Sequence, residues 1–358
     1  MDFVDSDESD FDFDVLQVIV LRRKRKIKER PDFFHYYDDV DFRDRFRMCK
    51  DAAWFIFSLI KEKIYIGTRN NAMQPHQMFF ITLRFYASGS FQQTVADLCG
   101  VSKTSASRAI KLVSHHIASL RADFVKLPQT EQERLSTQAA FKEISNFPRV
   151  IGAMDCTHVK IMSPGGDDGE VFRNRKGFFS FNVQTICDSN LKILDIVARW
   201  PGSVHDSRIF RNSRICYRLE AKEFLNAVIV ADSGYENTNV VLTPLLNCRN
   251  RAENLYNESH IRTRNCIERS YGVWKRRFPV LSMGIRMKVT TVPYIIVATA
   301  VLNNVCIRFN DKTAPQLVPE IDDAVTNVLT VPPNRSNEGR SRNDQTRKTI
   351  IDTYFAQM

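Results

Sequence analysis

The sequence predicts a mixed α/β domain preceded by an all-helical domain, and two observations support this. Residues 41–146 contain amphipathic helical runs, such as those at 54–60 and 78–87, and no alternating strand pattern interrupts them. From Arg149 onward the pattern changes to short apolar runs separated by turn residues, which is typical of strands. We therefore expect a helical domain at 41–146 and a mixed sheet flanked by helices at 147–312.

The α/β domain is expected to contain four strands, in the segments RVIGAM, FNVQTICD, KILDIVARW and AVIVAD. Helical patterns lie between and after them, at 206–212 and 264–281. In the second of these helices an apolar stripe recurs at helical spacing, which predicts that the helix docks on the sheet. The stripe consists of Ile267, Tyr271, Trp274, Phe278 and Leu281.

The composition favours a globular protein with an anionic partner. The chain of 358 residues is 43% hydrophobic and 26% charged, and 51 Lys and Arg residues against 41 Asp and Glu residues give a net charge of +10. Nucleic acid is the leading partner for such a charge, although the charge alone fits a basic protein without a polyanion equally well. The eight cysteines lack the spacing of a zinc module or a disulfide framework, which favours a reducing compartment.

Both ends of the chain are predicted to lie outside the folded domains, and residues 1–40 are predicted to be disordered. Residues 1–40 contain the acidic segment MDFVDSDESDFDFD and the basic cluster RRKRKIKER, which is typical of nuclear import signals and nucleic-acid tails but also fits a solvated charge run. Residues 313–358 are predicted to be mostly disordered, because PPNRSNEGRSRNDQTRK is polar and rich in turn residues. The acidic start differs from a secretory signal, and the longest apolar stretch is shorter than the ~20 residues of a membrane-spanning helix. We therefore expect a nuclear or cytoplasmic protein without a membrane partner.

Residues 92–111, QQTVADLCGVSKTSASRAIK, have the pattern of helix, tight turn and helix. Gly100 can adopt the left-handed conformation of the turn, and Ser102 can cap the second helix. The second helix is suited to a DNA major groove, but the same pattern also fits an ordinary pair of packed helices. In a helix-turn-helix, the DNA-binding residues would be Lys103, Thr104, Ser107, Arg108 and Lys111.

Three acidic residues form the candidate catalytic site. Asp155 and Asp232 each end an apolar strand, where a buried carboxylate is costly unless it binds a cation or hydrogen-bond donors. Glu268 borders the apolar stripe of the helix that docks on the sheet. Converging carboxylates require cations, and Mg²⁺ or Mn²⁺ prefers oxygen ligands. Two such ions about 4 Å apart can activate a water or a 3′-hydroxyl and stabilise the leaving oxygen of a phosphodiester. Each acid alone also fits a surface carboxylate or a cap.

Further polar residues lie near these acids in the sequence. Asp206, in RWPGSVHDSRIF, is either an additional metal ligand or part of a helix cap with Ser203. His205 and His158 are expected to be structural or close to DNA rather than metal ligands. Basic residues near Glu268 and in NRKGF would bind phosphates, or would only solvate the surface. Those predicted to bind DNA are Arg175, Lys176, Arg264 and Lys275.

Five segments in this order resemble the PIF/Harbinger family of DDE transposases and its domesticated nucleases, over about 79–309: AMDCTHV, NRKGFFSFNVQTICD, RWPGSVHDSRIF, ADSGYENTNVVLTPL and RNCIERSYGVWKRRFPVL. The resemblance implies an RNase H-like catalytic fold, an upstream helix-turn-helix and a DNA substrate. It also implies a separate Myb-like partner protein that assists DNA binding and nuclear entry. The metal-binding set falls on Asp155, Asp206, Asp232 and Glu268.

We therefore expect a metal-dependent DNA endonuclease, with strand transfer if the chain is still a transposase. Two alternatives stay open: a catalytically silent DNA-binding or chromatin-associated protein, and an RNase H-like enzyme that acts on RNA. The sequence does not determine the DNA target or the oligomeric state, and a homo-oligomer is compatible with it.

Overall fold

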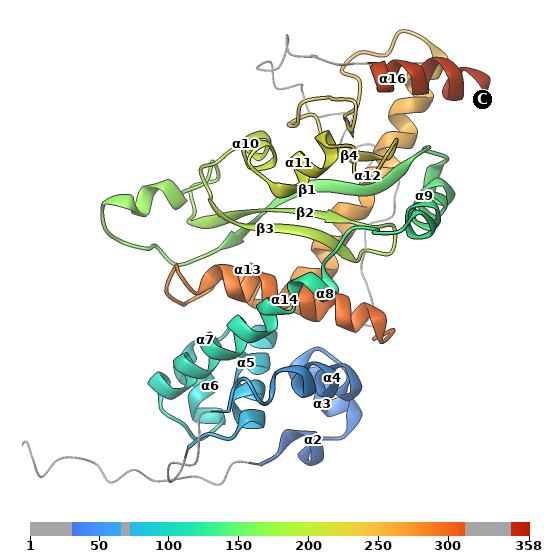
Figure 1. Ribbon diagram of the computed structural model, residues 1–358. Helices are drawn as coiled ribbons and strands as arrows, with labels where there is room; N and C mark the ends of the chain where they lie inside the picture. The colour runs from blue at the N-terminus through green and yellow to red at the C-terminus, as the bar shows by residue number, and fades with distance from the viewer. Residues whose placement is uncertain (1–30, 66–71, 312–344) are drawn as a thin grey trace, which may run out of the picture.

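A five-stranded mixed sheet forms the centre of the computed structural model, which describes residues 31–65, 72–311 and 345–358 (Figure 1). The strand order is β3-β2-β1-β4-β5. β2 runs antiparallel to β1 and β3, whereas β4 runs parallel to β1 and β5 parallel to β4. This confirms the mixed α/β prediction. The strands are β1 (Val150–Lys160), β2 (Ser180–Cys187), β3 (Ile193–Pro201), β4 (Val228–Ala231) and β5 (Val241–Leu242).

Four strands match the predicted segments, with two differences. β1 continues past the predicted strand to Lys160, because its polar second half pairs with β2. Such pairing depends on a distant segment and leaves no apolar run in the sequence. β5 was not predicted, since its two residues are too few to form a recognisable pattern.

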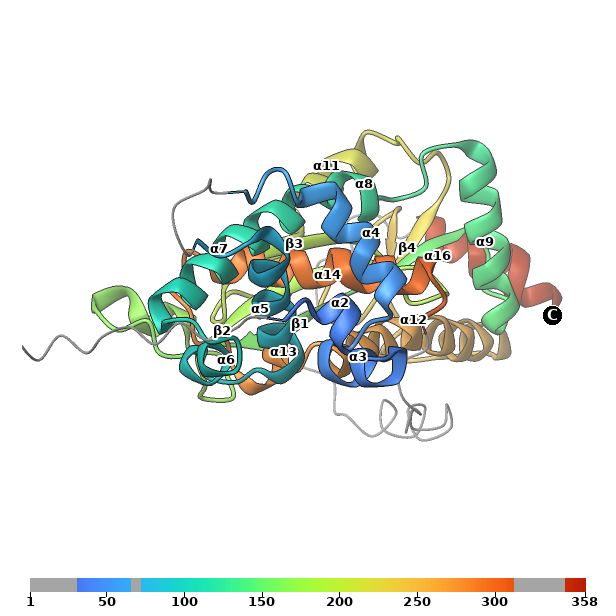
Figure 2. The ribbon, with the colours of Figure 1, turned by 90° about the horizontal axis from the view of Figure 1, so that it is seen from below.

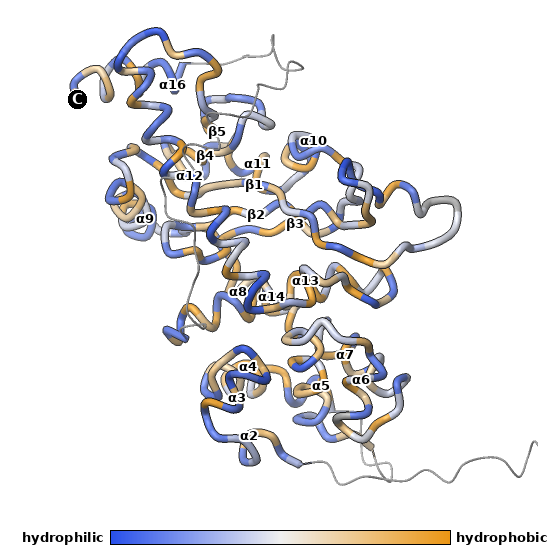
Figure 3. Tube along the Cα trace, turned by 180° about the vertical axis from the view of Figure 1, so that it is seen from behind, coloured by the Kyte–Doolittle hydropathy of each residue, from blue (hydrophilic) through white to orange (hydrophobic). Residues whose placement is uncertain are grey.

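Helices cover both faces of the sheet. On one face, α10 (Asp206–Arg211) and α11 (Arg214–Glu220) share a core with apolar residues of β1, β2 and β4. On the other face lie α12 (Arg251–Arg277) and α14 (Val292–Arg308), with α9 (Glu131–Ser145) packed against α12 and β1. These three layers fit the RNase H-like arrangement. Figure 3 shows hydrophobic residues along the strands and α14, and hydrophilic residues along much of α12.

The predicted helical segment does form helices, but its last helix belongs with the sheet. α9 was expected in the helical domain at 41–146, yet its buried Phe141 lies in the core formed by β1, β4 and α12. A helical pattern in the sequence does not indicate which layer its apolar side faces. The helices before α9 are α2 (Phe33–Tyr36), α3 (Asp39–Phe46), α4 (Lys50–Ile60), α5 (Pro75–Ser88), α6 (Gln92–Leu98), α7 (Lys103–Ser119) and α8 (Arg121–Phe124).

α14 joins the helical part of the chain to the sheet. It is apolar and buried on nearly all sides, as expected of a helix enclosed by other elements. It packs against α7 on one side and β3 on the other, and Figure 2 shows α4, α5 and α7 covering it. Asn304 fixes the contact with β3, because its side-chain amide accepts from Ile193 N at 2.9 Å and donates to Ile193 O at 2.6 Å. No helix among the described residues is long and apolar enough to cross a membrane.

Two terminal segments that were predicted to be disordered are helical where the structure describes them. Phe33 and Phe34, within the predicted disordered segment 1–40, are buried in the helical core. At the other end, residues 345–358 form α16 (Gln345–Thr349), η3 (Ile350–Tyr354) and η4 (Phe355–Gln357), and Ile350 and Phe355 are buried beside α12. The prediction was wrong there because a segment that is polar overall is predicted to be disordered even when it contains a short apolar cluster. Residues 1–30 and 312–344, including both charged N-terminal clusters, lie outside the described residues.

The remaining elements are short. η1 (Asp167–Phe172) lies in the connection between β1 and β2, and α13 (Val280–Met283) follows α12.

Candidate functional site

Asp155 lies on β1, and Asp232 directly follows the neighbouring parallel strand β4. Met154 of β1 is paired with Ala231 of β4, and each acid is the next residue of its chain segment. Asp232 therefore follows the end of its strand, as predicted. Asp155 instead lies inside β1, because the strand continues in its pairing with β2. The prediction that Asp155 ends a strand was wrong, although it does lie where the pairing of β1 with β4 ends.

Short hydrogen bonds orient both carboxylates. Asp155 Oδ1 accepts from the backbone N–H of Cys156 at 2.7 Å, and Asp232 Oδ1 accepts from that of Gly234 at 3.0 Å. The second oxygen of Asp155 faces the guanidinium of Arg264, with 3.6 Å between Oδ2 and Nη1. The two carboxylates are thus held by the backbone and by α12.

α12 brings Glu268 to the same group of acids through Arg264. Arg264 Nη2 donates to Glu268 Oε1 at 2.7 Å, one helical turn further along α12. The Arg264 side chain is only 10% exposed, whereas that of Glu268 is 47% exposed. The sequence predicted that Arg264 binds DNA, but in this structure its guanidinium pairs with two of the candidate metal ligands. A linear sequence does not show that a basic residue one turn from Glu268 points inward.

Asp206 is the first residue of α10 and lies against β2. Its Oδ1 accepts from Asn182 Nδ2 at 2.8 Å. The N-cap of α10 is His205, and no side chain caps the helix. The capping box that Ser203 and Asp206 could have formed is therefore not made.

Burial and like charge raise the pKa of two of the acids. Burial raises the pKa of Asp155 to about 7, with the charges of Asp232 and Asp206 adding to the effect and Arg264 opposing it. Burial also raises the pKa of Asp232, where Asp206 and Glu268 add to the effect while Arg264 and a backbone N–H oppose it. The charges of Asp206 and Glu268 therefore act on the two strand aspartates, and the charge of Arg264 opposes that effect.

The donor chemistry of the cluster fits a hard divalent cation, but the ligands are not assembled. Four carboxylates supply only oxygen, which Mg²⁺ and Mn²⁺ prefer. Burial raises the pKa of Asp155 and of Asp232, so a nearby positive charge would favour the ionised form of both acids. Within residues 31–65, 72–311 and 345–358, however, no three His, Cys, Asp or Glu side chains are placed to hold a metal ion. Asp155, Asp206, Asp232 and Glu268 are the residues that would hold such an ion.

Basic residues from two segments meet beside the polar half of β1. Lys275 of α12 donates to Thr157 Oγ1 at 2.6 Å and to the His158 carbonyl at 3.0 Å. Burial and the nearby charge of Lys176 lower the pKa of Lys275 to about 8. Burial lowers the pKa of His158 as well, and its Nδ1 lies 3.0 Å from Ser180 Oγ. Arg175 and Lys176 are exposed. Lys275 thus faces β1 next to the acids rather than the outer face of α12.

The predicted helix-turn-helix residues lie on α6, α7 and the turn between them. Gly100 adopts a positive φ of 62°, and Ser102 caps α7 by accepting from the backbone N–H of Ser105 at 3.1 Å. Ser107 is half-buried. The other predicted DNA-binding residues on α7 are exposed, namely Lys103, Thr104, Arg108 and Lys111. The geometry agrees with the expected helix pair but does not by itself distinguish DNA binding from helix packing.

Two buried polar residues of β2 near the acids were missed by the sequence analysis. Asn182 and Gln184 are 2% and 0% exposed, and both lie on the face of the sheet that α10 covers. Their signal was present in FNVQTICD, where two amides interrupt a strand that is otherwise suited to full burial. Tyr271 was counted only as an apolar stripe residue, but its hydroxyl donates to the Asp155 carbonyl at 2.6 Å and thereby fixes α12 against β1.

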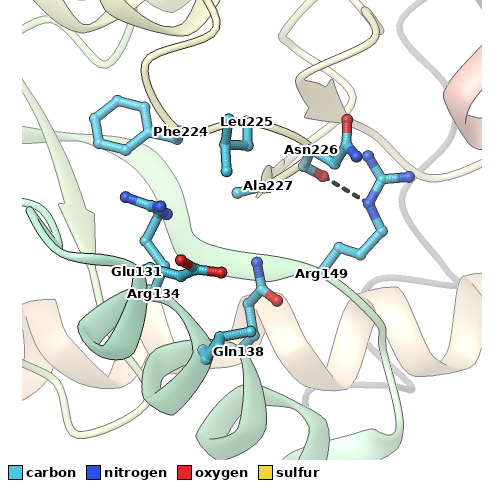
Figure 4. Close-up of a pocket in the computed structure, with 9 residues that line it drawn as sticks. Glu131, Arg134, Gln138, Arg149, Phe224, Leu225, Asn226 and Ala227 are labelled. Carbon is cyan, nitrogen blue, oxygen red and sulfur yellow. Dashed lines mark hydrogen bonds between the residues drawn. The ribbon is translucent and has the colours of Figure 1, made fainter.

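A separate cavity of about 360 Å³ opens between α9 and the loop before β4 (Figure 4). Arg149 and Ala227 on its wall directly precede β1 and β4, so the cavity lies at the opposite end of these strands from Asp155 and Asp232. Arg149 Nε donates to the Asn226 carbonyl at 2.6 Å on one side of it. The cavity is therefore not part of the acidic site.

Comparison with known proteins finds a family match over the part of the chain that contains the four acids. Residues 154–304 match the family model described as "DDE superfamily endonuclease". The chain is 29% identical to the protein named "Putative nuclease HARBI1" of Rattus norvegicus over 80% of this chain and 82% of that protein. For the human protein of that name the identity is 30% over 67% of this chain and 69% of the relative.

A plant relative is more distant. "Protein ALP1-like" of Arabidopsis thaliana is 22% identical over 77% of this chain and 73% of that protein. No solved structure matches the chain significantly.

Proposed function

Because the chain belongs to the Harbinger transposase-derived nuclease family of DDE superfamily endonucleases, we propose that it cleaves DNA phosphodiesters with divalent cations held by four acids. The proposed ligands are Asp155, Asp206, Asp232 and Glu268. Asp155, Asp232 and Glu268 are the proposed catalytic set.

The observation that carries this proposal is that Asp155 and Asp232 follow paired residues of β1 and β4, with the charges of Asp206 and Glu268 near enough to act on them. Buried like charges oppose folding, which is why burial and the neighbouring acids raise the pKa of Asp155 to about 7. Strongly perturbed ionisable groups gather at functional sites more often than elsewhere. A site that binds cations gives a physical reason for keeping these acids together.

Divalent cations at these carboxylates would make a water or a 3′-hydroxyl a better nucleophile and stabilise the leaving oxygen of a phosphodiester. The protein's own contribution is to orient the acids through the backbone N–H groups of Cys156 and Gly234. Lys275, Arg175 and Lys176 surround the polar half of β1 with positive charge, where they would hold DNA phosphates next to the acids.

The direct test is cleavage of supercoiled plasmid by the purified chain. We expect nicked and linear products with Mn²⁺ or Mg²⁺, and none with EDTA, because carboxylates alone do not activate the nucleophile. A single-stranded RNA of equal nucleotide content in the same reaction serves as the substrate control. Failure to cleave DNA with either metal contradicts the proposal, and preferential cleavage of RNA contradicts its substrate.

One structural observation favours a second candidate, a catalytically silent DNA-binding protein. Arg264 already pairs with Asp155 and Glu268, so the acids have a built-in cation that stabilises the fold without metal. In that case Mn²⁺ would neither support cleavage nor raise the melting temperature.

Joining of DNA ends to the plasmid, in contrast, would show strand transfer in addition to hydrolysis.

Replacing both Arg108 and Lys111 with Ala is expected to weaken DNA binding without unfolding the protein. Both side chains are exposed on α7, so their removal leaves the core intact. If each contacts a phosphate, the slope of log affinity against log salt should decrease by about 2. Fluorescence anisotropy with a labelled duplex at several salt concentrations measures both quantities.

The matched control is the double change Lys61→Ala and Lys63→Ala, which removes the same charge from an exposed site after α4. Equal affinity loss in the two double variants would mean that only net charge matters. Unchanged affinity of the α7 variant at low salt would remove α7 as a DNA-binding helix.

A further inference from the structure

Asn182 connects β2 to the segment that carries Asp206. Its Nδ2 donates both to the Val204 carbonyl and to Asp206 Oδ1, each at 2.8 Å. An amide nitrogen donates but does not accept, so both bonds depend on one side-chain orientation. The side chain is buried, with 2% of the residue exposed.

The loop before α10 lies directly on β2. A Cβ atom at Gly202 would overlap Ser180 Oγ and the Phe172 carbonyl, so only glycine permits this approach. Ser180 and Asn182 are two residues apart on β2 and face the same side of the sheet. Close packing at Gly202 and hydrogen bonds at Val204 and Asp206 therefore fix the loop at both of its ends.

Asp206 lies close enough to two other acids for their charges to interact. The negative charges of Asp206 and Asp155 act on each other, and those of Asp206 and Asp232 do the same. Asp206 is only half-buried and makes no helix-capping hydrogen bond. Without a donor on β2, rotation toward solvent would relieve the repulsion.

The side-chain oxygen of Asn182 indicates that this residue has a role other than stabilising the fold. Its Oδ1 is buried and has no hydrogen-bond partner among the described residues. An unsatisfied buried acceptor is unfavourable, and an apolar side chain of the same size avoids this loss. A polar residue kept at such a position points to a role outside stability.

We propose that Asn182 is a positioning residue that holds the Asp206 carboxylate toward Asp155 and Asp232 for metal binding. The inference rests on the proposed function, in which Asp206 is a metal ligand. Asn182 acts through Asp206 and does not itself touch the metal or the DNA.

Calorimetric titration of the full chain with Mn²⁺ tests this inference without measuring cleavage. Asn182→Leu keeps the side-chain size and removes the donor, so the Mn²⁺ dissociation constant should increase by about 10- to 100-fold, as is usual when a group orienting a metal ligand is lost. Asp206→Ala should produce an increase at least as large. If Asn182 acts only through Asp206, the double variant should bind Mn²⁺ no more weakly than Asp206→Ala alone.

Asn212→Leu is the matched control, because this exposed asparagine at the other end of α10 also donates from Nδ2 to a backbone carbonyl, that of Arg208, at 2.8 Å. It should bind Mn²⁺ as the wild type does. Wild-type affinity in Asn182→Leu, or a double variant whose loss equals the sum of the two single losses, overturns the inference alone. A wild-type protein that binds no Mn²⁺ overturns the proposed function as well. Asn182→Ala replaces the leucine variant if that variant does not fold.

Discussion

Asp155→Asn is expected to reduce Mn²⁺-dependent plasmid cleavage by about 10³-fold, which corresponds to ~4 kcal/mol of transition-state stabilisation. The asparagine keeps the size of the side chain and can still accept from the Cys156 N–H, so the loss would come from the missing charge rather than from altered packing. Initial rates of nicking, measured with saturating Mn²⁺, provide the comparison.

At neutral pH and without metal, the same variant should be more stable than the wild type. The pKa of the Asp155 carboxyl is raised from its ordinary value of 3.8 in the unfolded chain to about 7 in the folded protein. The folded state therefore binds the proton more tightly. The stability of the metal-free wild type should therefore fall as the pH rises from about 4 to about 7, by on the order of 4 kcal/mol. Asp155→Asn should lack this contribution. Urea unfolding with EDTA at about pH 4 and about pH 8 measures the difference.

Asp195→Asn is a matched control for both measurements. Asp195 is also a strand aspartate with an arginine partner, Arg121, at 3.4 Å, and burial raises its pKa, but it lies on the edge strand β3. It should alter the pH dependence of stability without altering cleavage. Equal cleavage by wild type and Asp155→Asn would exclude Asp155 from the catalytic set.

Asp311→Ala should lower the free energy of unfolding by about 3–5 kcal/mol, because it leaves a buried arginine without its carboxylate. The Asp311 side chain is fully buried and accepts from Arg277 Nη1 at 3.2 Å, from Arg43 Nε at 3.1 Å and from the Cys49 N–H at 2.7 Å. The Arg277 side chain is only 3% exposed. These bonds join the end of α12 to α3 and to the start of α4, so equilibrium urea unfolding should show the loss.

Glu258→Ala provides the comparison for a surface ion pair. Glu258 and Arg262 are 2.7 Å apart, but their side chains are 49% and 44% exposed. Its removal should change stability by less than about 1 kcal/mol. Similar losses in the two variants would show that the buried network contributes no more than a surface pair.

Much of the sheet could be predicted because its strands carry their own signals. The apolar runs before Asp155 and Asp232 indicated two buried strands, and the parallel pairing of β1 with β4 then brings the two acids together. Glu268 could be placed near them because the apolar stripe of α12 indicates which side of that helix faces the sheet.

The features that could not be predicted depend on contacts between distant segments. Arg264 and Lys275 look like solvent-exposed phosphate ligands in the sequence, and only the position of α12 against β1 directs them to Asp155 and to Thr157. The hydrogen bonds of Asn182 likewise depend on where the loop before α10 returns to the sheet. Hydrophobic periodicity describes one helix or strand at a time and contains no information about which distant segments come into contact.

The shared helix α14 has a consequence for how the chain would select a cleavage position. Since α14 packs against α7 on one side and β3 on the other, the exposed face of α7 and the acidic cluster belong to one continuously packed body. If α7 reads base pairs, the protein fixes the distance along the duplex between the sequence that α7 contacts and the bond that is cut. The offset should then be a constant number of base pairs at every target, whatever the intervening sequence.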